Sequence, residues 1–281
     1  MQSHSTAENL FLEAGNGVKY AYRRFGNAKS TPPLVFLQHF RGNLENWDPL
    51  LVDNLARERE VILLDNTGIG LSSGLVPRNV TQMARDTLAF LDALRLSEID
   101  LLGYSLGGFV AQELALLRPR LVRRIVLAGT GPQGGGEGMH GWIQDVFTVA
   151  NAENNKPEDL LWLFFAPTET SQQKGREYLK RAFSRREGRD KPNGMDVARA
   201  QYDAIVEWGI PDPSRLARLR GIIQPALIAN GEHDTMIPAV NSHILARHIP
   251  NSRVRIYGDA GHGFLFQFPT EFAAVMSAFL A

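Results

Sequence analysis

The sequence contains no cysteine among its 281 residues, and its 30 basic and 30 acidic side chains leave no formal net charge. Without cysteine there are no disulfides, thiolate nucleophiles or sulfur-ligated metals, a pattern compatible with the cytoplasm. A balanced charge gives no electrostatic reason to bind nucleic acid or an anionic membrane. These absences favour a small, neutral molecule as the partner.

Long apolar runs are also missing. The longest extends from Leu160 to Ala166, whereas a membrane-spanning helix takes about 20 apolar residues. The first residues, Met1 to Ser5, are polar and lack the basic start and apolar core of a signal peptide. We therefore expect an intracellular, cytoplasmic protein, either a monomer or a homodimer.

The most informative motif present is G-x-S-x-G at residues 103–107, centred on Ser105. It lies between an apolar run typical of a buried parallel strand and an amphipathic helical pattern. In such a turn the serine adopts a strained conformation at the strand tip, and the flanking glycines leave room for the reversal. The motif predicts Ser105 as a nucleophile, with the backbone amide of Leu106 as a donor to developing negative charge. The alternative is an ordinary helix-capping serine.

A serine nucleophile needs a base, and the base needs an acid to orient it. His262 is the predicted base, because it sits between two glycines in a loop after an apolar run, where open α/β sheets gather reactive groups. Asp234 is the predicted acid, since it lies far into another such loop and gives the order serine, acid, histidine. Glu232 and Asp259 remain alternatives for the acid.

The loop after the apolar run 34–38 predicts a second donor for an oxyanion hole. His39 begins this loop and is expected to shape it rather than to act as a base. We expect the backbone amide of Arg41, with that of Phe40 as the alternative, to join the amide of Leu106.

Strand and helix patterns alternate along most of the chain, after an opening hairpin pattern at residues 9–26. This alternation predicts a doubly wound, mostly parallel α/β sheet. Residues 134–217 show helical patterns and no strand pattern, so the alternation stops there. We therefore predict a helical cap, formed by this segment and inserted into one core that consists of residues 1–133 and 218–281. The predicted strands lie at 34–38, 60–64, 99–102, 123–128, 225–229 and 253–257.

The predicted cap carries six aromatic side chains that are candidates to wall an apolar pocket: Trp142, Phe147, Trp162, Phe164, Phe165 and Trp208. From this set we predict that Trp142, Trp162 and Phe165 bind substrate. Phe40 from the oxyanion loop and Phe264 beside the proposed base complete the prediction. For each cap aromatic, the alternative is a place in the core of the cap.

The motifs at residues 39–42, 65–72, 103–107, 231–234 and 261–263 together resemble the α/β-hydrolase superfamily. They look most like its small, cofactor-independent branch of serine esterases, enol-lactonases and non-haem haloperoxidases. The resemblance implies no cofactor and no metal. One departure is Phe40, which stands where the family usually has glycine.

The sequence therefore predicts a serine hydrolase that cleaves a small ester, thioester or lactone through an acyl-enzyme on Ser105. A C–C bond hydrolase or a perhydrolase on the same triad is an alternative, because pocket shape and water access separate these activities. A small-molecule receptor that keeps the triad as a ligand anchor is another.

Overall fold

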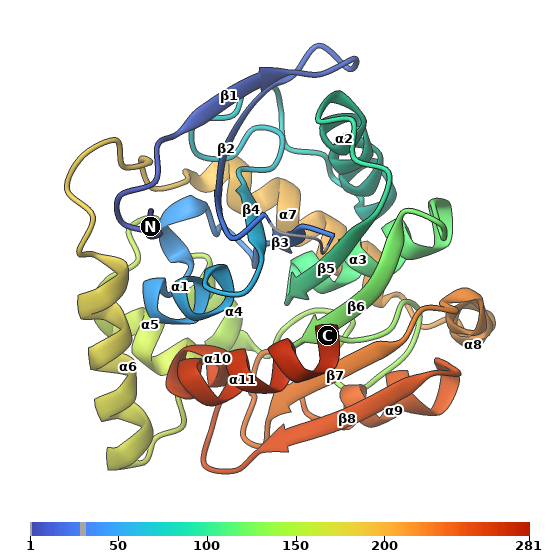
Figure 1. The fold of residues 1–281 in the computed structure, drawn as a ribbon. Coiled ribbons are helices and arrows are strands. Elements are labelled where there is room, and N and C mark those ends of the chain that lie inside the picture. The colour runs from blue at the N-terminus through green and yellow to red at the C-terminus, as the bar shows by residue number, and fades with distance from the viewer. Residues whose placement is uncertain (1, 29–31) are drawn as a thin grey trace.

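An eight-stranded sheet forms the centre of the molecule in the computed structural model, which describes residues 2–28 and 32–281 (Figure 1). The strand order is β1-β2-β4-β3-β5-β6-β7-β8. The strands are β1 (Leu10–Glu13), β2 (Lys19–Gly26), β3 (Leu34–Leu37), β4 (Glu60–Leu64), β5 (Ile99–Tyr104), β6 (Val122–Ala128), β7 (Ala226–Gly231) and β8 (Ser252–Tyr257).

The sheet is parallel except at one end. β1 and β2 form the predicted antiparallel hairpin, and β2 is also antiparallel to β4. All other neighbouring strands pair in parallel. β3 is buried at every position because helices cover both faces, which explains its uninterrupted apolar sequence. The predicted doubly wound α/β fold is confirmed.

The helices of the core lie in two layers. α1 (Pro49–Ala56) packs against α11 (Pro269–Leu280) on one face, and α2 (Val80–Ala93) packs against α3 (Leu106–Leu117) on the other (Figure 1). α9 (Val240–His248) packs on β7 and β8, and the short α10 (Phe264–Gln267) precedes α11. Two 3₁₀ helices, Leu44–Asn46 and Ala217–Gly221, complete the core. Within the described residues, no helix is long and apolar enough to cross a membrane.

Residues 134–217, called here the helical insert, contain helices and loops but no strand. Its helix α6 contacts α1 and α10, whereas α7 contacts α2, so the insert reaches both layers of the core. Its helices are α4 (Gln144–Ala150), α5 (Pro157–Phe164), α6 (Glu169–Ala182), α7 (Met195–Gly209) and α8 (Pro213–Leu216).

Parallel strands bring their following loops to one edge of the sheet. Leu37 at the end of β3 pairs with Gly103 of β5, and Gly231 at the end of β7 pairs with Tyr257 of β8. The loops that carry the sequence-predicted site residues therefore start from the same edge.

Candidate active site

Ser105 occupies a strained turn between β5 and α3. Its φ of 56° and ψ of −120° lie outside the conformations that side-chain-bearing residues prefer. Three bonds hold the turn: the Ser105 amide donates to Ala128 O at 2.9 Å, and its carbonyl accepts from Gly108 N and Thr130 Oγ1. The surrounding structure thus fixes the serine in a conformation that it would not adopt alone.

The glycines around Ser105 are required by close approaches. A Cβ on Gly103 would lie 2.4 Å from the carbonyl oxygen of Gly107, and one on Gly107 would lie 2.2 Å from that of Leu37. These distances are far below van der Waals contact. The G-x-S-x-G spacing is therefore what lets helix α3 start directly against β3 and β5.

Asp234 and His262 form a buried pair. His262 Nδ1 lies 2.7 Å from Asp234 Oδ2, and both side chains are fully buried. The other carboxylate oxygen of Asp234 accepts from the backbone amides of Met236 and Ile237 at 2.8 and 2.9 Å. His262 Nε2 is buried with no hydrogen-bond partner among the described residues. The acid is held rigidly, and the outer nitrogen of the imidazole is available.

Neither alternative acid contacts the imidazole. Glu232 is exposed and lies 3.9 Å from His233. The Asp259 carboxylate accepts from Thr168 Oγ1 at 2.7 Å in an exposed position. Of the three candidates weighed from the sequence, Asp234 is the one that the fold brings to His262.

His39 lies, as a neutral group, in the loop after β3, where the sequence predicts an oxyanion donor. Its Nδ1 bonds to Phe40 O at 2.8 Å, and its amide donates to the Gln38 side chain. Its ring packs edge-on against Tyr104 and Phe164. Burial lowers the pKa of His39 to about 3, so it holds the loop without carrying charge near neutral pH.

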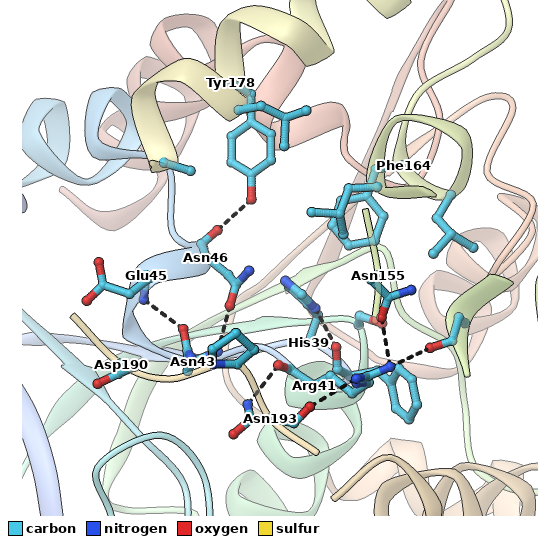
Figure 2. Close-up of a pocket in the computed structure, with 18 of the residues that line it drawn as sticks. His39, Arg41, Asn43, Glu45, Asn46, Asn155, Phe164, Tyr178, Asp190 and Asn193 are labelled. Carbon is cyan, nitrogen blue, oxygen red and sulfur yellow. Dashed lines mark hydrogen bonds between the residues drawn. The ribbon is translucent and has the colours of Figure 1, made fainter. Parts of the chain in front are cut away.

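Arg41 has a φ of +57° and makes all its polar contacts with the helical insert (Figure 2). Its amide donates to Gln201 Oε1 at 2.6 Å, and its carbonyl accepts from Asn193 Nδ2 at 2.8 Å. Its guanidinium donates to neutral oxygens of residues 150–155 and of Asn193. The sequence pattern gave no signal for these contacts, because they join segments far apart in the chain.

A cavity of about 280 Å³ lies between the core and the insert, and Ser105, His262, His39 and Arg41 all line it. Apolar walls come from α5 and α6 and include Leu163, Phe164 and Leu179. A second part is polar, as Figure 2 shows. It is lined by Asn43, Glu45, Asn46, Asn155, Asp190 and Asn193.

The two acidic side chains at the polar end, Glu45 and Asp190, interact with other ionisable groups. Glu45 forms a buried ion pair with Arg23. Burial, followed by the neighbouring Asp190, raises the pKa of Asp65 well above its usual range, and burial also raises the pKa of Asp190. The charge of Glu45 is thus balanced by Arg23, and Asp190 holds its proton more strongly than an exposed aspartate does.

The predicted substrate-binding aromatics separate into two groups. Phe40 lines the cavity, and Trp142 packs on it and lines a smaller cavity that also includes Ser105. Phe164, a cap candidate, lines the main cavity as well.

Three other predicted residues are not among the cavity-lining residues that the structure describes. Trp162 is 48% exposed on α5, and Phe165 packs against Tyr178. Phe264 is buried against Tyr257 and Phe272 in the core. The structure therefore corrects the prediction for these three: Trp162 is largely exposed, Phe165 follows α5 and packs on Tyr178, and Phe264 packs in the core.

Fold and cavity define a class of protein: a doubly wound α/β protein with a pocket at the carboxyl ends of its parallel strands. Residues 32–269 match the family model for the alpha/beta hydrolase fold. The chain belongs to this family, and it is a hydrolase of the α/β fold.

Comparison with solved structures gives close matches. An alpha/beta hydrolase fold protein from Chitinophaga pinensis superposes with a TM-score of 0.92 at 37% identity, covering 99% of both chains. Est816, described as an N-acyl homoserine lactone degrading enzyme, gives a TM-score of 0.73 at 27% identity, covering 96% of this chain and all of its own.

Among curated proteins, the dihydrolipoyllysine-residue acetyltransferase component of the acetoin cleaving system from Pseudomonas putida is 33% identical over 252 residues. The match covers 88% of this chain but only 63% of that relative's length.

Proposed function

We propose that this chain is a serine hydrolase that cleaves a small ester, thioester or lactone through an acyl-enzyme on Ser105. The observation that carries the proposal is the Asp234–His262 pair in the cavity that Ser105 also lines. His262 Nε2 has no hydrogen-bond partner in the part of the chain that the structure describes, so it is free to accept a proton from a reacting hydroxyl. The strained conformation of Ser105 is a second supporting feature, because such strain is typical of functional sites.

In the proposed reaction, the Ser105 hydroxyl attacks the substrate carbonyl while His262 Nε2 accepts its proton. The Asp234 carboxylate holds the ring and stabilises the imidazolium. The amide of Leu106 donates to the oxyanion together with that of Arg41, or with that of Phe40 as the alternative. The imidazolium then protonates the leaving group. Water, deprotonated by His262, finally releases the acyl group from Ser105 as an acid.

The cavity limits the substrate class. A volume of about 280 Å³ suits a small molecule, and its two kinds of wall suit one with an apolar part and a polar part. The lactone-degrading relative Est816 supports a cyclic or open ester of this kind. In this proposal the helical insert acts as a cap that supplies the apolar wall.

Replacement of Ser105 tests the proposal. We expect Ser105→Ala to reduce hydrolysis of p-nitrophenyl acetate by about 10⁴-fold or more, with an unchanged circular dichroism spectrum. A fluorophosphonate should add to the wild-type protein at Ser105 and not to the variant. Substantial turnover by Ser105→Ala would refute the mechanism. Labelling of Ser105 without turnover across an ester panel would instead favour a receptor.

A further inference from the structure

Ser105 lies between two cavities of very different size. It lines the main cavity of about 280 Å³, which His262 also lines, and a smaller cavity of about 10 Å³, which His262 does not line. The smaller volume is close to the minimum that one water molecule needs. The proposed nucleophile therefore faces ample space in one direction and room for a single small group in another.

The walls of the smaller cavity are apolar. Apart from Ser105 and Gly138, the described residues that line it have aliphatic, thioether or aromatic side chains, among them Phe109, Met139 and Ile205. A water molecule in a protein interior needs two to four polar partners, and apolar cavities without them stay empty. A methyl group is similar in size to a water molecule and needs no such partners. The smaller cavity therefore suits a short alkyl group.

The walls are also held in place from several directions. Phe109 stacks on Trp208 with ring centroids 5.2 Å apart. The backbone of Met139 lies so close to α7 that a Cβ on Gly209 would be 1.6 Å from the Met139 carbonyl oxygen. Ile237, a further wall residue, has both its amide and its carbonyl in buried hydrogen bonds. Because close-packed interiors resist small displacements, the cavity does not widen readily.

The position of the base indicates which part of an ester each cavity receives. The leaving group takes its proton from His262, so it has to lie in the main cavity. The acyl substituent is bonded to the same carbonyl carbon and points away from the leaving group. The smaller cavity opens at Ser105 and is not lined by His262, which makes it the space for the acyl substituent.

We propose that the smaller cavity is an acyl pocket that accepts a methyl group, and that Met139 and Ile205 are specificity-determining residues that limit the acyl chain to acetyl. This inference rests on the proposed function. It narrows the substrate class to acetyl esters or thioesters whose alcohol or thiol part is larger and carries polar groups. A lactone joins its acyl and leaving parts in one ring, so it suits two separate cavities less well than an open ester does.

The acyl-chain profile of the wild-type protein tests the proposal without any variant. One extra methylene in a hydrophobic pocket is worth about 10- to 200-fold in kcat/KM. We therefore expect kcat/KM for p-nitrophenyl acetate to exceed that for the propionate by at least about tenfold, and the butyrate to be slower still. The main cavity has room for a larger leaving group, so 4-methylumbelliferyl acetate should be hydrolysed about as fast as p-nitrophenyl acetate.

Ile205→Ala should widen the pocket, since it removes three carbon atoms and butyrate carries two more than acetate. We expect the ratio of kcat/KM for the butyrate to that for the acetate to rise by at least about tenfold. Ile205→Val removes one carbon atom and disturbs the packing less, and it should raise the corresponding ratio for the propionate. Ile249→Ala is the matched control. Ile249 is also buried but is not among the residues that line either cavity, so this variant should keep the wild-type ratios.

Equal kcat/KM values for acetate, propionate and butyrate in the wild-type protein would overturn the inference. A butyrate ratio in folded Ile205→Ala that matches that of Ile249→Ala would do the same. In either case, labelling of Ser105 by a fluorophosphonate together with an inactive Ser105→Ala would leave the proposed function intact. A wild-type protein that is neither labelled nor active on any of these esters would overturn both.

Discussion

Tyr104 donates its phenolic hydrogen to the backbone carbonyl oxygen of His262, at 3.1 Å. The two rings also lie 5.1 Å apart, inclined by 31°. Tyr104 is the last residue of β5 and directly precedes Ser105, whereas His262 lies in the loop after β8. The contact therefore links the proposed nucleophile and base through the residue between strand and turn.

Removal of this hydroxyl should loosen the His262 loop. Tyr104→Phe leaves a buried carbonyl without its donor, which costs about 1–3 kcal/mol of unfolding free energy. Small displacements of a catalytic group reduce rates strongly, so we expect kcat to fall several-fold. Tyr20→Phe is the control, since Tyr20 also donates from a buried position to a backbone carbonyl, that of Asp86 at 2.9 Å. Esterase assays and urea unfolding should show both variants destabilised but only Tyr104→Phe slower.

Asp234→Asn tests the orienting acid. Its Oδ1 is held by two backbone amides and its Oδ2 by His262, so an amide would favour the wrong imidazole tautomer without changing the shape of the site. In a serine protease the equivalent change lowers kcat by about 10⁴-fold, and we expect a loss of that order. Glu232→Gln and Asp259→Asn should keep wild-type activity. If Asp259→Asn lowered kcat and Asp234→Asn did not, Asp259 would be the orienting acid instead.

Gly107→Ala tests the packing of the elbow. The new Cβ would lie 2.2 Å from Leu37 O and 2.8 Å from Gln38 O, both backbone atoms that have little room to move. Overpacking of this kind costs about 1–3 kcal/mol or more, and a shifted α3 would also lower activity. Gly15→Ala is the control, because nothing lies within 4 Å of its added Cβ. Thermal unfolding should separate the two variants clearly.

His4 gives the stability a predictable dependence on pH. Burial, followed by the nearby Arg23, lowers the pKa of His4 to about 3. Above a pH of about 6.5, His4 is neutral in both the folded and the unfolded state and contributes nothing. Below it, the unfolded chain binds a proton that the folded protein rejects, so stability falls by about 1.4 kcal/mol per pH unit down to about pH 3.

Urea unfolding between about pH 6 and pH 4 measures this slope. As the pH falls, the unfolding free energy of His4→Gln should decrease less steeply than that of the wild-type protein. The two slopes should differ by the contribution of about one bound proton. His243→Gln, at an exposed position, should keep the wild-type slope. An identical slope in the wild-type protein and His4→Gln would show that His4 titrates normally in the fold.

Much of the fold could be predicted because buried parallel strands produce short apolar segments that are easy to locate in the sequence. β4 occupies residues 60–64 as predicted, and β8 begins one residue before its predicted start. β4 is an almost continuous apolar run, whereas β8 alternates Arg253 and Arg255 with apolar residues, and each strand ends in a polar loop. The contact between Asp234 and His262 follows the same logic, since two adjacent parallel strands carry their loops to one edge.

The side chains that line the cavity were harder to predict. Composition marks Trp162 and Phe165 as apolar, but their directions depend on the rotation of α5 and on where that helix ends, which single-sequence patterns do not fix. Asn193 and Gln201 carry no motif at all. Their importance arises from contacts with Arg41 that exist only once the insert lies on the core.

The dependence of Arg41 on the insert bears on how such enzymes can be recombined. Its amide, its carbonyl and its guanidinium all end on residues between 150 and 201. In a chimera that receives the insert of a relative, the half-buried guanidinium of Arg41 and its strained loop would lose these partners. The residue at position 41 must therefore be transferred together with the insert, although the two are far apart in the sequence.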